Sequence, residues 1–129
     1  MIHPALLEPR SIAIIGASND LSKPGGRVLH NIISHGYEGQ LYGVNPKEHQ
    51  VQGVACFPDV TALPQADCAI IAIAAPFVVP AMEVLAFQKN CKAFILFTAG
   101  FSETGEPGRA LEDRCVQIAN EAGATLIGP

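Results

Sequence analysis

The chain has 129 residues, enough for one domain that buries its own core without metal or disulfide support. Apolar residues make up 49% of the sequence and charged residues 16%, which fits an α/β core and excludes a disordered chain. The net charge of -4 provides no general attraction to nucleic acid or acidic membranes, so we expect neither as a partner. No apolar run approaches the roughly 20 residues that span a membrane, and we expect a cytoplasmic location.

The first apolar run ends in a glycine-rich turn. Residues 12–15 are uniformly apolar, which is typical of a parallel strand buried on both faces. Gly16 lets the backbone turn and approach a ligand, so we expect valine there to abolish binding and leave the fold largely intact. Ser18 adds a hydroxyl, and glycines at 25–26 precede a helical pattern that Gly36 ends. The order strand, loop and helix start predicts a site for phosphate or pyrophosphate.

The rest of the chain alternates strand and helix patterns. Residues 51–57 fit a short edge strand, and 59–63 fit a single helical turn. The other predicted strands are 40–44, 68–73, 93–97 and 124–127, and the helices begin near 28, 76 and 107 and end before Gly36, near Lys89 and at Gly123.

This alternation predicts one α/β domain, a Rossmann-like doubly wound parallel sheet with right-handed crossovers and helices on both faces. In the usual strand order, the first strand lies between the second strand and the strand at 68–73. The topological switch, where the strand order reverses, then lies between Gly16 and Ala74, and we expect the ligand there.

The residues favour NADP or coenzyme A (CoA) over NAD, the usual ligand of this fold. Ser18 and Leu21 stand where the GxGxxG pattern has its second and third glycines. Lys47 follows the second strand where an NAD site carries an acidic residue. Its ammonium suits a ribose phosphate, as in NADP or at the 3′ position of CoA. Lys23 and Lys47 also fit solvated turn residues, so the choice of ligand stays open at this point.

The remaining candidates indicate neither a catalytic group nor a metal site. The four histidines have no partner at a recognisable catalytic spacing, and the four cysteines lack metal-ligand spacing. Cys68 and Cys115 fall on apolar faces and are predicted to be inert, buried thiols. The small residues at 74–76 and 98–100 fit plain turns after strands, but they also leave room for a pantetheine or nicotinamide arm.

Six motifs in order resemble the CoA-binding domain of NDP-forming acyl-CoA synthetases. They cover nearly the whole chain: SIAIIGAS at 11–18, KPGGR at 23–27, VNPK at 44–47, the strand and turn at 68–76, TAGFSETG at 98–105 and LIGP at 126–129. The same domain is similar to the N-terminal part of the succinyl-CoA synthetase alpha subunit, and it occurs in protein lysine acetyltransferases.

The resemblance implies a CoA site built from four groups of residues. The CoA phosphates would be held by Gly16, Ala17, Ser18, Lys23 and Gly26. The adenosine 3′-phosphate end would be flanked by Val44, Asn45, Pro46 and Lys47. The pantetheine path would be lined by Ala74, Ala75 and Pro76, and the thiol end by Thr98, Ala99 and Gly100. This chain has Ala99 where succinyl-CoA synthetases have a glutamate.

The resemblance also implies that residues 1–129 are one CoA-binding domain from the N-terminal part of a larger protein. The parent would be an acid-thiol ligase that interconverts acyl-CoA, NDP and phosphate with acid, CoA and NTP. An acyl phosphate, a phosphohistidine in a following domain and a nucleotide-grasp domain or subunit would take part, so this domain alone would be inactive. The alternatives are a CoA-sensing regulatory domain of a protein lysine acetyltransferase and an NADP-binding oxidoreductase domain.

Overall fold

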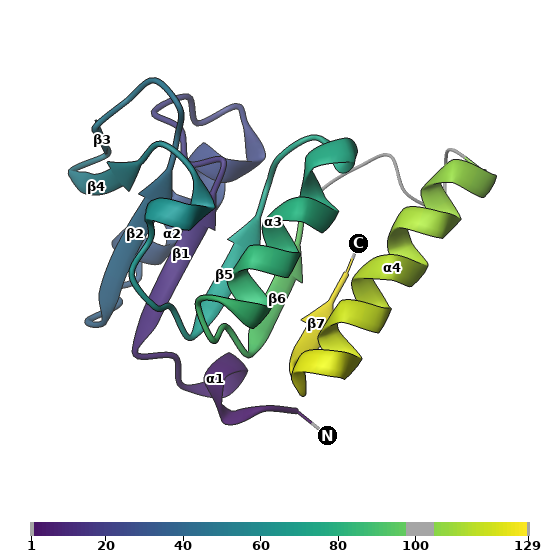
Figure 1. Cartoon of the computed structure of the whole chain (residues 1–129). Helices are drawn as coiled ribbons and strands as arrows, with labels where there is room; N and C mark the ends of the chain where they lie inside the picture. Colours follow the sequence, from purple (N-terminus) through teal and green to yellow (C-terminus); the bar gives the residue numbers. More distant parts are fainter. Residues whose placement is uncertain (1, 98–104, 129) are drawn as a thin grey trace.

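A mostly parallel sheet with helices on both faces forms the fold (Figure 1). The structure is a computed structural model that describes residues 2–97 and 105–128. The seven strands of these residues are β1 (Ser11–Ile15), β2 (Gln40–Val44), β3 (Gln50–Val51), β4 (Val54–Phe57), β5 (Cys68–Ile71), β6 (Ala93–Leu96) and β7 (Thr125–Ile127). The helices are α1 (Pro4–Leu7), α2 (Pro24–Ser34), the short 3₁₀ turn η1 (Val60–Ala62), α3 (Ala75–Phe87) and α4 (Glu106–Ala122).

The strand order confirms the predicted doubly wound topology. It is β3-β4-β2-β1-β5-β6-β7, and every neighbouring pair is parallel except β3 with β4. β1 pairs with β2 on one side and with β5 on the other. The point where the strand order reverses, the topological switch point, therefore lies between β1 and β5, where a ligand of this fold binds.

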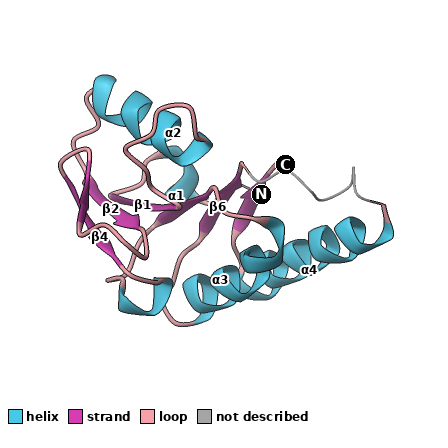
Figure 2. Ribbon diagram, turned by 90° about the horizontal axis from the view of Figure 1, so that it is seen from above, coloured by secondary structure: helices cyan, strands magenta, loops and turns pink. Residues whose placement is uncertain are grey.

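Strand alternation divides the core between the two faces of the sheet. Ile12 and Ile14 of β1 pack with Leu29 on the α2 side, whereas Ala13 and Ile15 pack on the side of α3 and α4. Figure 2 shows α1 and α2 above the sheet and α3 and α4 below it. Both faces of β1 are buried, which explains its continuous apolar run.

Element boundaries differ from the predictions by a few residues, and the short helix α1 was not predicted. Helix α2 begins at Pro24, before the two glycines, because proline needs no N–H partner at a helix start. β5 ends at Ile71, earlier than predicted, although Ala72 N–H still donates to the Ile15 carbonyl of β1 at 2.8 Å. The predicted edge strand at 51–57 is the hairpin β3–β4, and the predicted helical turn is η1.

Cys68 and Cys115 are buried, as predicted, and Cys91 is buried as well. Burial raises the pKa of Cys68 and Cys115 to about 11 and that of Cys91 to about 12. Because the thiolate is the reactive form, we expect iodoacetamide at pH 8 to leave these three thiols unmodified in the folded protein. Mass spectrometry checks this result, with the urea-unfolded chain as the control that takes up label at all of them. Rapid labelling of the three in the folded state would contradict this packing.

Within the described ranges, every helix is too short or too polar to cross a lipid bilayer.

Candidate functional site

The turn after β1 is held by backbone hydrogen bonds that it donates to β2. The N–H groups of Gly16 and Ala17 both donate to the Val44 carbonyl, at 3.0 and 3.2 Å. Gly16 has φ +94°, and a Cβ there would lie 2.4 Å from the carbonyl oxygen of Ala72. The expectation that valine at this position leaves the fold largely intact is therefore wrong, because the space beside Gly16 is filled by the protein's own backbone.

Short polar contacts shape the loop between β1 and α2. The Ser18 hydroxyl accepts from Asp20 N–H at 2.9 Å, and the Asp20 carboxylate accepts from both the hydroxyl and the N–H of Ser22. The two Ser22 donors hold the pKa of Asp20 below its usual value. Lys23 is the N-cap of α2, and its side chain makes no capping bond. The first turn of α2 therefore starts without a side-chain cap, at the edge where the strands end.

Gly25 and Gly26 let this loop lie directly on the start of α2. Both residues are buried. A Cβ at Gly25 would lie 2.0 Å from the Gly16 carbonyl oxygen, and a Cβ at Gly26 would lie 2.1 Å from that of Asp20. The two glycines are thus required by close backbone packing between loop and helix.

An apolar cleft of about 440 Å³ opens at the carboxyl ends of β1 and β2. Gly16, Val44 and Pro46 line it from the sheet side. Val60 of η1 and Phe77 of α3 also line it, and Phe77 is 64% exposed. The cleft thus presents apolar walls and an accessible aromatic ring, which suits a flat, weakly polar group.

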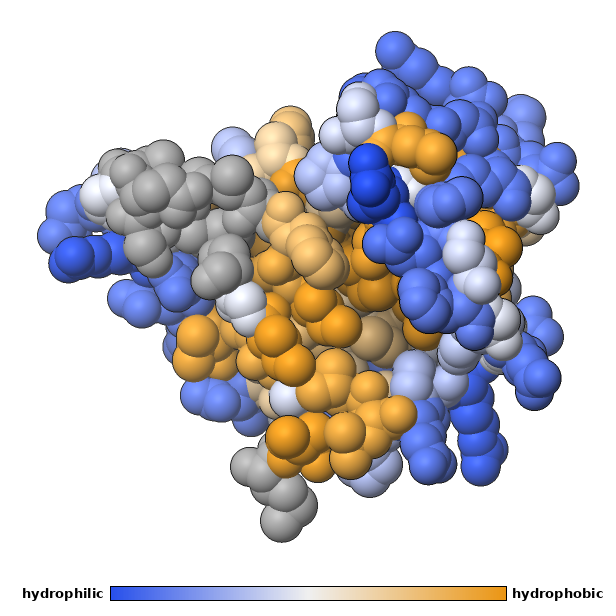
Figure 3. Space-filling view, turned by 180° about the vertical axis from the view of Figure 1, so that it is seen from behind, coloured by the Kyte–Doolittle hydropathy of each residue, from blue (hydrophilic) through white to orange (hydrophobic). Residues whose placement is uncertain are grey.

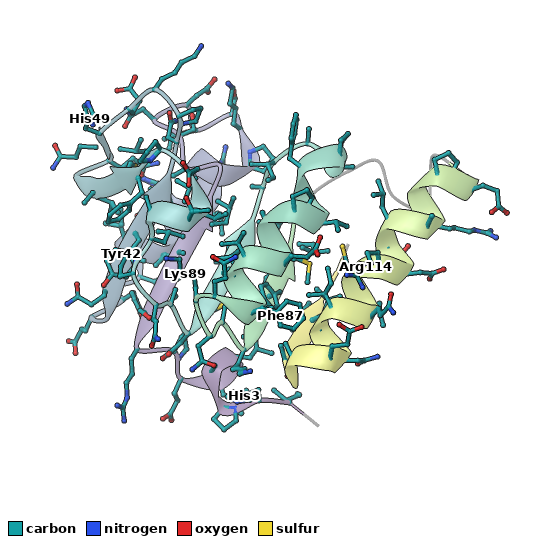
Figure 4. The ribbon with its side chains drawn as sticks, in the orientation of Figure 1. His3, Tyr42, His49, Phe87, Lys89 and Arg114 are labelled. Atoms are coloured by element: carbon teal, nitrogen blue, oxygen red, sulfur yellow. The ribbon has the colours of Figure 1, made fainter. Side chains whose placement is uncertain are left out.

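Asn45 connects the turn after β2 to the loop after β1. Its Nδ2 donates to the Ala17 carbonyl at 2.9 Å, and its Oδ1 accepts from the N–H groups of Lys47 and Glu48 at 2.8 and 3.0 Å. A small hollow of about 60 Å³ lies beside this turn, lined by Lys47 and His49 among others. Figure 4 places His49 at this end of the sheet and His3 at the opposite end.

The predicted site residues occupy different positions around the switch point. Gly16, Val44 and Pro46 line the cleft, and Asn45 and Lys47 line the adjoining hollow. Ser18, Lys23 and Gly26 lie on the loop and the start of α2. Ala17 is 1% exposed and packs in the core, while its N–H and carbonyl bond to Val44 and Asn45.

The residues predicted for the pantetheine path begin helix α3. Ala74 is its N-cap, Ala75 is buried and Pro76 is exposed, and the neighbouring Ile73 and Phe77 line the cleft. Thr98, Ala99 and Gly100 lie outside the described residues. The sequence analysis missed Val60 and Phe77, because an apolar residue carries no local signal that separates a cleft wall from the core. Among the described residues, no three His, Cys, Asp or Glu side chains gather as a metal-binding group.

A glycine-rich loop and an apolar cleft at the switch point of a doubly wound sheet define a nucleotide-binding domain of the Rossmann type. Residues 10–129 match the family described as "CoA binding domain". The chain therefore belongs to the family of CoA-binding domains, as its motifs predicted, and its ligand is CoA. This match selects CoA over NADP, the other ligand that the residues had left open.

Two similar proteins are a subunit of an acetate–CoA ligase and a trans-feruloyl-CoA synthase. The chain is 41% identical over 122 residues to the alpha subunit of acetate–CoA ligase [ADP-forming] II from Pyrococcus furiosus, covering 94% of this chain and 26% of that subunit. It is 39% identical over 125 residues to a trans-feruloyl-CoA synthase from an unknown prokaryotic organism, covering 96% of this chain and 18% of the synthase.

A solved structure shares the fold closely. The dinucleotide forming acetyl-coenzyme A synthetase 1 of Ca. Korarchaeum cryptofilum superimposes with a TM-score of 0.87 at 32% identity, covering 97% of this chain and 27% of that one. The chain thus spans only about a quarter or less of the length of these relatives.

Proposed function

We propose that this chain is the CoA-binding domain of an NDP-forming acyl-CoA synthetase, an acid-thiol ligase that contains further domains or subunits. The observation that carries the proposal is the arrangement at the switch point, where the glycine-rich loop, the Lys47 turn and the apolar cleft adjoin one another. The similarity to ADP-forming acetate–CoA ligases supports the reaction class. The acyl phosphate and phosphohistidine steps would take place in parts of the parent outside these 129 residues.

In this proposal the adenosine end of CoA binds between β2 and α3. The adenine ring is the flat aromatic part of CoA and suits the apolar cleft, where Phe77 offers a ring for stacking. The ribose that carries adenine also carries the 3′-phosphate. Pro46 lines both the cleft and the hollow that contains Lys47, so a ribose at the cleft mouth brings its 3′-phosphate near the Lys47 ammonium.

The pyrophosphate lies, in this proposal, against residues 16–18 and the start of α2. Gly16, Ala17 and Ser18 shape the backbone there, and Gly26 lies in the first turn of α2. Lys23 is an exposed cation on the same loop. The chain has a net charge of -4, so these local cations and the helix start would supply the attraction for the CoA phosphates. The pantetheine arm would then pass Ala74, Ala75 and Pro76 toward Thr98, Ala99 and Gly100.

We also propose that a phosphohistidine domain and a nucleotide-grasp domain or subunit act with this one. An apolar surface on the sheet face away from α3 and α4 supports contact with another protein part (Figure 3). Ile95 and its register partner Ile127 contribute to this face, and Phe97 follows by strand alternation. Phe97 and Ile127 are 49% and 46% exposed.

The free thiols among the described residues support our proposal of a reducing, cytoplasmic location.

Calorimetric titration of the chain with CoA, acetyl-CoA, dephospho-CoA, NADP and NAD, at one moderate salt concentration, tests the binding part of the proposal. We expect binding of the CoA compounds and none of comparable strength for NADP or NAD. A preference for NADP would overturn the proposal.

Sequencing the gene beyond codon 129 tests the synthetase part of the proposal, which predicts a histidine-bearing domain. An appended acetyltransferase domain would instead favour a role in regulating acetylation.

Replacing Lys47 with alanine is expected to weaken CoA binding by about tenfold and dephospho-CoA binding much less, because only CoA has the 3′-phosphate. Titration of the variant with both ligands measures the two ratios. Arg10→Ala is the matched control. It removes one exposed positive charge at the opposite end of the strands and should change neither affinity. Equal losses of affinity for CoA and dephospho-CoA in Lys47→Ala would contradict the placement of the 3′-phosphate near Lys47.

A further inference from the structure

Gln52 has an unfavourable backbone conformation in the turn between β3 and β4. Val51 pairs with Val54, so Gln52 and Gly53 form a two-residue hairpin loop, with φ +49° and +81°. Both central residues of such a turn have positive φ, and asparagine, aspartate or glycine are favoured there. A glutamine at the first of these positions is unfavourable for the hairpin, so the turn itself does not explain why glutamine stands there.

The Gln52 side chain reaches from the hairpin both to the loop that joins β1 to α2 and to the first turn of α2. Its Nε2 donates to the carbonyl oxygens of Ser18 and Gly26, each at 2.9 Å. Its backbone N–H donates to the Asn19 side-chain oxygen, also at 2.9 Å. These three bonds connect residues 26 to 34 positions apart, and Gln52 is half-buried.

A second amide side chain continues the same pattern. Asn45 Nδ2 donates to the Ala17 carbonyl, so the consecutive carbonyls of Ala17 and Ser18 are each held by an amide from residues 45–52. A carbonyl oxygen that accepts such a bond is held toward the amide and is less free to face an anion. A free carbonyl facing a phosphate would repel it, because the carbonyl oxygen carries a partial negative charge.

We propose that Gln52 is a positioning residue that holds the loop and the first turn of α2 in the conformation that accepts the CoA pyrophosphate. One amide group fixes Ser18, at the start of the loop, relative to Gly26, in the helix. The loop is thereby ordered before the ligand arrives, which lowers the entropy lost on binding. The identity of the ligand rests on the proposed function, whereas the three hydrogen bonds do not.

Two variants separate this role from a structural role in the hairpin. Gln52→Asn introduces a residue favoured in the turn but one methylene too short to reach both carbonyls. Gln52→Met keeps the chain length and removes the donor. Gln50→Asn is the matched control, because Gln50 is an exposed glutamine of the same hairpin, in β3.

We expect both Gln52 variants to raise the dissociation constants of CoA and dephospho-CoA by about tenfold and by the same factor, since both ligands contain the pyrophosphate. Gln52→Asn should keep the thermal midpoint of the wild type. Unchanged affinity in both variants, or affinity lost only in proportion to stability, would overturn the proposal. So would a loss that spares dephospho-CoA.

Amide hydrogen exchange without ligand provides a test that does not depend on CoA. We expect the amides of residues 18–26 to exchange faster in both Gln52 variants and at the wild-type rate in Gln50→Asn. Unchanged exchange in the Gln52 variants would overturn the positioning role. A wild-type chain that fails to bind CoA but shows the expected exchange pattern would refute the proposed function and leave the role of Gln52 in ordering the loop supported.

Discussion

Gly16→Ala is expected to destabilise the folded chain by about 3 kcal/mol or more, a large part of the roughly 5–15 kcal/mol that stabilises a domain. Two costs add at this position. The backbone has φ +94°, which is strained for any residue with a Cβ. The new Cβ would also lie 2.4 Å from the Ala72 carbonyl oxygen, and this backbone is held by the bond from Ala72 N–H to Ile15. Urea unfolding followed by circular dichroism measures the loss.

Gly36→Ala separates the two costs. Gly36 also has positive φ, +76°, but no atom lies within 4 Å of the position of its Cβ. This control should lose only about 1 kcal/mol, the cost of the backbone conformation. Equal losses in the two variants would mean that Ala72 moves aside easily, and a fully stable Gly16→Ala variant would contradict the described turn.

Gly25→Ala is expected to destabilise the fold by about 2 kcal/mol and to weaken CoA binding at least tenfold. Glycine to alanine within a helix normally stabilises it by about 1 kcal/mol. Here the Cβ would lie 2.0 Å from the Gly16 carbonyl oxygen, so the turn and the helix must separate. The change therefore displaces the two segments between which we propose the pyrophosphate binds. Urea unfolding and CoA titration measure the two effects.

Asn31→Ala is the control in the same helix. Asn31 is exposed on α2, so alanine there should leave CoA affinity unchanged and raise stability slightly. A Gly25→Ala variant more stable than the wild type would show that the loop and α2 are not in contact as described. A variant that is destabilised but binds CoA normally would place the pyrophosphate elsewhere.

The glycines at 16, 25 and 26 show how one sequence signal fits two physical causes. We interpreted Gly16 as room for a ligand, and a Gly-Gly pair before a helix has the same appearance. In the structure, the nearest neighbours of each absent Cβ are backbone carbonyl groups of Ala72, Gly16 and Asp20. These glycines allow segments of the chain to pack closely, and they shape the proposed phosphate site by that means.

The sequence by itself determined the doubly wound topology and the order of the strands and helices, apart from α1 and the division of the edge strand into β3 and β4. It also predicted that the ligand site lies at the carboxyl ends of the strands. Apolar periodicity, proline at helix starts and glycine at turns act over a few residues, so they can be interpreted without tertiary contacts. The motifs also identified the family. Only the tertiary structure decided that Val60 and Phe77 form the cleft walls and that Gln52 holds Ser18 and Gly26. These contacts join residues that are far apart in the sequence and that the strand order brings together. A pattern of a few neighbouring residues therefore cannot predict them.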